Sequence, residues 1–135
     1  MTSRDSMIEM IKQALAARDK GDIDGVMAAF HPNATFELKG AKDVLEVAGS
    51  VQGHRDVRAA MTQFIESFEF MKREIVETLV DGDRIAVHSR VKVRFIPKDI
   101  VVTTELLDRF RLADGKVVEL VEFADTALIK QLVSA

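Results

Sequence analysis

The chain has 135 residues, a length typical of one domain, and we expect a single domain over residues 1–135. Its formal net charge of -3 excludes the strong positive field that attracts nucleic acid or an anionic membrane. The sequence has no cysteine, which excludes disulfides and thiolate metal sites and is compatible with the reducing cytoplasm, where we expect this protein. No stretch approaches the roughly 18 apolar residues that span a bilayer. We therefore expect neither nucleic acid nor a membrane as a partner.

Two helices are predicted at the start of the chain. Apolar residues recur at three- and four-residue steps over residues 4–20, which predicts an amphipathic helix. Gly21 suits the left-handed conformation in which many helices end. Asp22 is a suitable N-cap for a short second helix. Pro32 ends that helix, because a residue before proline avoids the helical conformation.

The middle of the chain changes from helical to strand periodicity. A short strand is predicted over residues 34–38, a mixed loop over 39–53 and a third helix over 56–71. After that helix the period of the apolar residues falls from about 3.6 to 2, which indicates strands. Turn signals at Asp81–Asp83 and Asp114–Gly115 separate strand-like runs. The four strands are predicted over residues 73–80, 84–96, 99–112 and 116–123.

The order of these elements predicts an α+β fold. A final helical turn begins at Asp125 or Thr126 and continues through Leu132. Helices gathered on one face of an antiparallel meander are typical of this fold class. Because such a sheet twists and curves, three helices packed on its concave face leave an apolar pocket between helix and sheet.

Strand alternation identifies Asp108 as the most informative residue. In the strand over residues 99–112, Asp108 shares a face with Leu106 and Phe110. A carboxylate on a core-facing position is costly unless it is paired, hydrogen-bonded or neutralised. Loss of solvent raises the pKa of such a group, and a carboxyl that is protonated near neutrality can donate or shuttle a proton. Asp108 is therefore the first candidate catalytic residue.

Other interpretations of the carboxyls stay open. Asp108 has a structural role if it binds a buried backbone N–H or an arginine, and a local bulge would turn it outward. Glu122 is the second candidate catalytic residue, because alternation places it on the face of Val118 and Leu120. Its position near a strand end favours a structural role in contact with water.

The expected pocket lining comes from helix stripes and core-facing strand positions. The candidate substrate-binding residues are Met27, Phe30, Leu38, Met61, Phe64, Ser89, Leu106 and Phe110. On the opposite strand face, Arg90, Lys92 and Arg94 indicate a solvated or subunit-facing surface rather than an anion site. No two of the three histidines have ligand spacing on one element, so we expect no metal.

Several motifs occur in a characteristic order and spacing. They are Gly21–Gly25 with Phe30–Thr35, Gly53–Arg58, Asp81–Arg84, Leu107–Leu112 with Asp114–Val118, and Glu122–Thr126. Together they resemble the SnoaL-like and ketosteroid isomerase-like proteins of the nuclear transport factor 2-like superfamily, over nearly the whole chain. The resemblance implies a cone-shaped, cystatin-like α+β barrel with an apolar pocket. It also implies a homodimer, which we expect to form through the sheet face.

The resemblance carries over only part of the isomerase machinery. In ketosteroid isomerases a buried, protonated aspartic acid helps a tyrosine to bind the substrate oxyanion. Asp108, within Leu107–Leu112, looks equivalent to that aspartic acid. The place of the tyrosine falls at Ala14 and that of the catalytic base at Leu38, so these two groups are absent. Glu37 is adjacent to the base position, but a shift of one residue points a strand side chain to the opposite face.

Two other activities of the superfamily bear on the function. Its epoxide hydrolases use an arginine and two aspartates; Glu122 resembles the site of one aspartate, whereas the other two groups fall near Val91 and Val93. SnoaL-like cyclases need only an acid or base in an apolar pocket, which Asp108 or Glu122 supplies. We therefore expect an acid–base enzyme of the isomerase or cyclase type for a small apolar carbonyl compound, without metal or organic cofactor. The alternatives are a non-catalytic small-molecule-binding or dimerisation module, and a protein-binding adaptor that uses the open sheet face.

Overall fold

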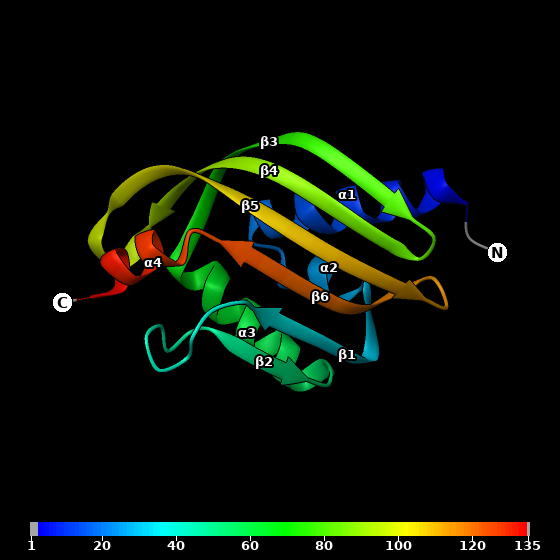
Figure 1. The fold of residues 1–135 in the computed structure, drawn as a ribbon, viewed down its shortest axis with the longest axis horizontal. Helices are drawn as coiled ribbons and strands as arrows, with labels where there is room; N and C mark the ends of the chain where they lie inside the picture. Colours follow the sequence, from blue (N-terminus) through cyan, green and yellow to red (C-terminus); the bar gives the residue numbers. More distant parts are fainter. Residues whose placement is uncertain (1–2, 135) are drawn as a thin grey trace.

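The computed structural model describes residues 3–134, which form a curved six-stranded sheet with helices on one side (Figure 1). The helices are α1 (Arg4–Lys20), α2 (Ile23–Met27), α3 (His54–Ser67) and α4 (Thr126–Val133). The strands are β1 (Phe30–Leu38), β2 (Gly49–Gln52), β3 (Phe68–Asp81), β4 (Arg84–Phe95), β5 (Ile100–Ala113) and β6 (Lys116–Ala124). A 3-10 turn over Ile96–Lys98 connects β4 to β5. The α+β class and the curved sheet packed on helices are confirmed.

The sheet has the strand order β2-β1-β6-β5-β4-β3 and does not close, so β2 and β3 form its edges. Strands β3 to β6 form the predicted antiparallel meander, and β1 pairs with β6 in parallel. The β5–β6 hairpin turns at Asp114 and Gly115, which have φ values of 54° and 70°. Positive φ at both central residues is what a tight two-residue hairpin requires, so this Asp-Gly pair fixes the register of β5 against β6.

Helix α1 follows directly from its sequence. The Ser3 side chain accepts a hydrogen bond from the Ser6 backbone N–H and caps the start of the helix. Gly21, with φ of 72°, ends it in the left-handed conformation. The buried residues of α1 are Ile11, Ala14 and Leu15, which lie on one helical stripe.

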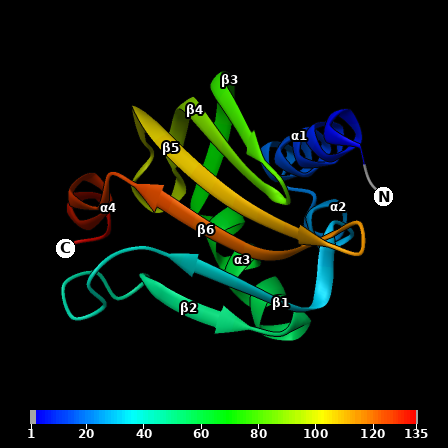
Figure 2. The same ribbon diagram turned by 45° about the vertical axis from the view of Figure 1, so that its right-hand side comes forward.

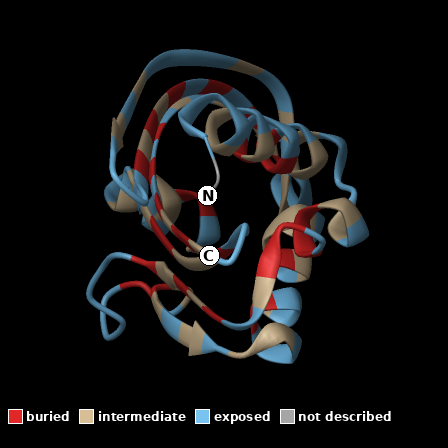
Figure 3. Ribbon diagram, turned by 90° about the vertical axis from the view of Figure 1, so that its right-hand side faces the viewer, coloured by how far each residue is buried: buried red, intermediate tan, exposed pale blue. Residues whose placement is uncertain are grey.

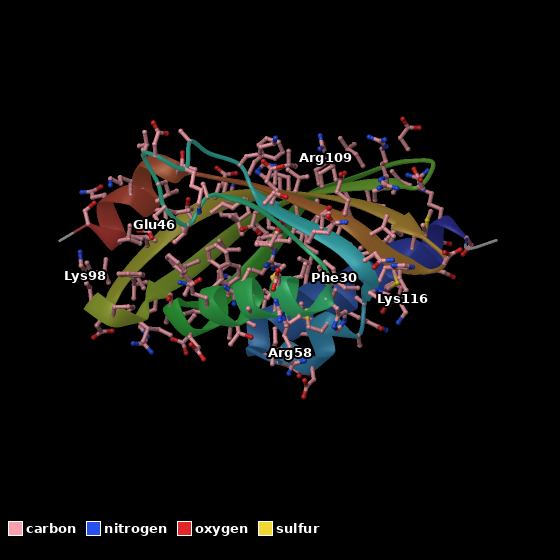
Figure 4. All side chains as sticks on the ribbon, turned by 90° about the horizontal axis from the view of Figure 1, so that it is seen from below. Phe30, Glu46, Arg58, Lys98, Arg109 and Lys116 are labelled. Atoms are coloured by element: carbon pink, nitrogen blue, oxygen red, sulfur yellow. The ribbon has the colours of Figure 1, made fainter. Side chains whose placement is uncertain are left out.

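Helices α1 and α3 lie on the same side of the sheet, and α4 lies beyond the end of β6 (Figure 2). Buried residues alternate with more exposed ones along the inner strands of the sheet and recur in the helices (Figure 3), and most of them belong to one core cluster shared by sheet and helices. Phe30 lies between sheet and helices, whereas Arg109 projects from the outer side of the sheet (Figure 4). The main core therefore fills the concave side. No helix within residues 3–134 has the length and apolar character needed to cross a membrane.

The structure corrects several predicted boundaries. Helix α3 ends at Ser67, so Phe68 belongs to β3 and not to the helix. Strand β3 starts there because Phe68 pairs with Phe95 of β4, and this pairing outweighs the local helical pattern. The predicted loop over residues 39–53 contains the short edge strand β2, which pairs with β1 from Gly49 to Gln52.

The alternation predicted at the start of β6 is wrong. It placed Val118 on the face of Leu120 and Glu122. The register of β5 against β6 shifts between Arg111 and Leu112, so two residues of β6 share one step of the ladder. Val117 consequently lies in the core with 0% exposure, and Val118 is only half-buried.

Candidate functional site

A cavity lies between the concave face of the sheet and helices α1, α3 and α4. It contains about 1000 Å³ of empty space, including its open mouth, and most of its wall is apolar. Six of the eight candidate substrate-binding residues line it: Phe30, Leu38, Met61, Phe64, Leu106 and Phe110. Met27 instead lies in the core beside the cavity, and Ser89 lies behind the wall, where its hydroxyl accepts a hydrogen bond from Arg73.

Asp108 and Glu122 both line this cavity from neighbouring strands. They are directly opposite each other in the β5–β6 pairing, so their side chains project to the same face. Asp108 is 2% exposed, whereas Glu122 is half-buried. Neither Asp108 oxygen has a hydrogen-bond partner within residues 3–134. Of the two structural partners predicted for Asp108, a backbone N–H is not found among these residues, whereas an arginine, Arg73, lies at the limit of ion-pair distance.

Burial raises the pKa of Asp108 well above its ordinary value of 3.8, and the negative charge of Glu122 raises it further. A hydrogen bond from a protonated Asp108 to Glu122 would act in the same direction, but the two carboxyls do not meet hydrogen-bond geometry in the structure. We therefore attribute the raised pKa to burial and charge repulsion. Arg73 and Arg18 oppose the rise without cancelling it. A protonated Asp108 is a hydrogen-bond donor that faces an apolar cavity.

Arg73 of β3 lines the same cavity next to Asp108. Its Nη1 lies 4.0 Å from Oδ2 of Asp108 and donates a hydrogen bond of 2.9 Å to the Ser89 hydroxyl. Its Nε and Nη2 donate to the Asp19 carboxylate at 2.9 to 3.1 Å. The Arg73 side chain is only 7% exposed, so Asp19 is its compensating charge. Asp108 therefore lies near an arginine that is already neutralised by another carboxylate.

A bulge in β3 turns Arg73 inward. The β3–β4 register shifts between Phe70 and Lys72, after which Arg73 pairs with the buried Val91. Phe70 and Arg73 thus both line the cavity although they are three positions apart, an odd spacing that places side chains on opposite faces of a regular strand. Sequence reasoning missed Arg73 because no residue type marks the place of this bulge.

Arg18 of α1 is the second arginine in the cavity wall. Its Nη2 donates hydrogen bonds to the backbone carbonyls of Phe68 at 3.1 Å and Phe64 at 3.5 Å. Its guanidinium carbon lies 4.0 Å from the centroid of the Phe70 ring, in cation–π geometry. Burial lowers the pKa of Arg18 below its ordinary value, and the negative charge of Glu122 is the largest of the effects that oppose this lowering. The sequence does indicate a buried position for Arg18, because Arg18 continues the buried stripe of Ala14 and Leu15 at helical spacing.

The positions that lack the isomerase and epoxide hydrolase groups are apolar parts of the same wall. They are Ala14, Leu38, Val91 and Val93, and all four line the cavity. Among residues 3–134, no group of three histidine, aspartate or glutamate side chains converges as a set of metal ligands. What the cavity offers chemically is the carboxyl pair and two guanidinium groups in a largely apolar wall, whose other polar residues are Thr104 and the exposed Asp125.

Comparisons of the sequence with known proteins identify its family. Residues 11–120 match the model of the SnoaL-like domain. A comparison with curated proteins finds no sequence match.

Solved structures share the fold at low sequence identity. A nuclear transport factor 2-like protein of unknown function from Burkholderia pseudomallei superimposes with a TM-score of 0.84 at 22% identity, covering 96% of this chain and 98% of that one. TerC, co-crystallised with polyporic acid, gives 0.82 at 20% identity, covering 96% and 99%. An epoxide hydrolase of M. tuberculosis, described as LEH-like, gives 0.74 at 17% identity, covering 95% and 89%. With this family match over most of its length, the chain belongs to the SnoaL-like family, and its fold is that of the nuclear transport factor 2-like protein.

Proposed function

We propose that this protein is an acid–base enzyme for a small, largely apolar carbonyl compound, acting by enolisation in an isomerisation or cyclisation. The observation that carries the proposal is the Asp108 carboxyl, which is 2% exposed, has no hydrogen-bond partner within residues 3–134 and faces the apolar cavity. Burial of an unsatisfied acid is destabilising, and such groups are found where chemistry needs them.

The two carboxyls have complementary roles in this proposal. Protonated Asp108 donates a hydrogen bond to the substrate carbonyl oxygen and stabilises the negative charge that develops there. The Glu122 carboxylate accepts the proton from the adjacent carbon, so that a C–H bond breaks as the enol forms. Return of that proton to a different carbon completes an isomerisation, and attack of the enol carbon on a second carbonyl completes a cyclisation. While the intermediate exists, the pair holds two protons, one on Asp108 and one taken up by Glu122. Return of the second proton to carbon, or its delivery to the alkoxide that a cyclisation forms, restores the starting state, and no other reactant is required.

The charges around the pair support this division of roles. Arg18 and Arg73 supply two positive charges near the carboxyls, and Asp19 neutralises Arg73. With Asp108 protonated, Glu122 and Asp19 balance the two arginines. With both members of the pair ionised, the cluster of Asp108, Glu122, Asp19 and the two arginines would carry one uncompensated negative charge in a largely buried site, which is unfavourable. The proposal also draws support from the SnoaL-like match and from fold relatives that include an LEH-like epoxide hydrolase and a protein co-crystallised with polyporic acid.

Exchange of carbon-bound hydrogen tests the proposal without knowledge of the natural substrate. The probe is 2-tetralone, an apolar bicyclic ketone, whose α-hydrogens are followed by NMR in D2O. We expect the wild-type protein to accelerate exchange, and Asp108→Asn and Glu122→Gln each to slow it by about 100-fold or more. Glu66→Gln, an exposed change of the same kind on α3, is the matched control and leaves the rate unchanged. Exchange at equal rates in the wild type and Asp108→Asn would sink the assignment.

A non-catalytic binding module is the second candidate, favoured by the apolar residues Ala14 and Leu38 at the places of the isomerase tyrosine and base. It predicts that 2-tetralone binds but that no variant changes its exchange. In either case we propose a homodimer through the outer face of the sheet. There Leu107 and Phe123 are paired across β5 and β6 with 39% and 38% exposure.

A further inference from the structure

The two arginines of the cavity differ in how far they are satisfied. Arg73 has a close carboxylate partner in Asp19. No carboxylate within residues 3–134 lies within 4.0 Å of the Arg18 guanidinium, although this group lines the cavity. An arginine without a close counterion in an apolar wall is costly, since a buried charge needs a partner.

Arg18 also has unused hydrogen-bond donors. A guanidinium carries five N–H groups. Only Nη2 makes hydrogen bonds within the described chain, to the carbonyls of Phe64 and Phe68. The N–H groups of Nε and Nη1 are therefore available to a ligand. The Phe70 ring covers one face of the guanidinium and helps to fix its orientation.

We propose that Arg18 binds a carboxylate of the ligand, so that the substrate is an apolar carbonyl compound that also carries a carboxylate. This inference rests on the proposed function for the reacting carbonyl, and on Arg18 alone for the acidic group. Planar, charge-assisted hydrogen bonds make arginine the preferred partner of carboxylates. The apolar part of the ligand packs on Phe68, Val91 and Val93, which line the same cavity.

The carboxyl pair does not prevent binding of an anion. With Asp108 protonated, Glu122 carries the only negative charge of the pair. This charge interacts favourably with the Arg18 guanidinium. A ligand carboxylate at Arg18 adds a second negative charge there, which disfavours ionisation of Asp108 further. Binding of the anion therefore reinforces the proton on Asp108 that the proposed chemistry needs.

A purely structural role is the competing explanation. Arg18 ties α1 to the junction of α3 and β3 through its bonds to Phe64 and Phe68. That role predicts a loss of stability on substitution and no preference for anions. The two explanations separate when the affinities of a charged and a neutral ligand of the same shape are compared.

The test measures dissociation constants of 2-naphthoate and 2-naphthamide by calorimetry at pH 7. These two probes share a ring system and differ in charge. We expect the wild type to bind the carboxylate about tenfold more tightly or better, as one charge-assisted hydrogen-bonded pair predicts. Arg18→Met removes the preference, and Arg18→Lys retains part of it because it keeps the charge but not the planar donors. Arg55→Met, at a 94% exposed arginine of α3, is the matched control and keeps the full preference.

Equal affinities of the two probes in the wild type, or an undiminished preference in folded Arg18→Met, would overturn the inference. If Arg18→Met does not fold, NMR of the wild type decides: the Arg18 Nε–H signal shifts on addition of 2-naphthoate and not of 2-naphthamide, and an unmoved signal refutes the contact. The outcome is independent of the exchange assay. If Asp108→Asn loses hydrogen exchange but the wild type shows no preference for 2-naphthoate, only this inference is refuted. If the wild type prefers 2-naphthoate but Asp108→Asn exchanges at the wild-type rate, only the proposed function is refuted.

Discussion

Asp108 and Glu122 face each other across two antiparallel strands and project into one cavity, one carboxyl almost fully buried and the other half-buried. Burial raises the pKa of Asp108 and favours its protonated form. In the proposed function, Asp108 is therefore the acid of the pair and Glu122 is the base.

The stability of the protein should depend on pH through Asp108. Its pKa in the folded state is raised above that of the unfolded chain, so the folded state binds more protons between the two values. Stability from this group is therefore fully present below the unfolded pKa near 3.8 and is lost as pH rises through the folded pKa. We expect the difference in unfolding free energy between wild type and Asp108→Asn to change by up to about 1.4 kcal/mol per pH unit in that window. Urea unfolding from pH 4 to pH 9 measures it, and a flat difference would contradict the raised pKa.

Substitution of Glu122 should lower the pKa of Asp108. Glu122→Gln removes the neighbouring negative charge, the second cause of the rise, but leaves burial, the first cause, in place. We expect the pKa of Asp108 to fall in this variant and to stay above its ordinary value. Titration of the Asp108 carboxyl carbon by NMR gives both values. The same titration in Glu66→Gln, at an exposed position, serves as the control and should match the wild type.

The sequence predicts Asp108 well because its strand is regular. The pairing of β4 with β5 runs without a register shift from Phe95 to Arg84, so simple alternation holds at Asp108. The same rule fails at Arg73 and Val118, where bulges change the parity. Bulges arise from the fit of a strand against its paired neighbour, and the alternation of residue types within one strand does not display that fit.

Arg18 was missed for a different reason. Its helical spacing placed it on the buried stripe of α1, and the charge of its side chain concealed that position. Long arginine side chains can bury their stems and still carry the charge into a polar niche. Here the niche is built by the carbonyls of Phe64 and Phe68, at the point where α3 gives way to β3. Because the sequence predicts that the third helix ends at residue 71 and not at Ser67, it does not place the junction of α3 and β3 at Phe68.

Arg73 should be important for stability as well as for the site. Arg73→Met leaves the Asp19 carboxylate without its partner and the Ser89 hydroxyl without its donor. Removal of one member of a largely buried ion pair costs about 3 kcal/mol. We expect a loss of that size in urea unfolding, together with a further rise in the pKa of Asp108, because Arg73 lowers it.

A double-mutant cycle isolates the Arg73–Asp19 pair. Asp19→Asn combined with Arg73→Met should cost clearly less than the sum of the two single changes, because either one already breaks the pair. Additive losses would mean that the contact contributes no coupling energy.

The outer face of the sheet should carry the dimer contact. Leu107 and Phe123 are cross-strand neighbours there, and Val101 is 45% exposed on the same strand as Leu107. Exposed apolar side chains gathered on the outer face of the sheet favour association with a second copy. Leu107→Glu places a charge at the centre of this patch, and we expect it to shift the protein to monomer in analytical ultracentrifugation. Val44→Glu, at a 58% exposed valine in the loop before β2, is the matched control and should remain a dimer. A wild type that stays monomeric at high concentration, or a dimeric Leu107→Glu, would rule out this face as the interface.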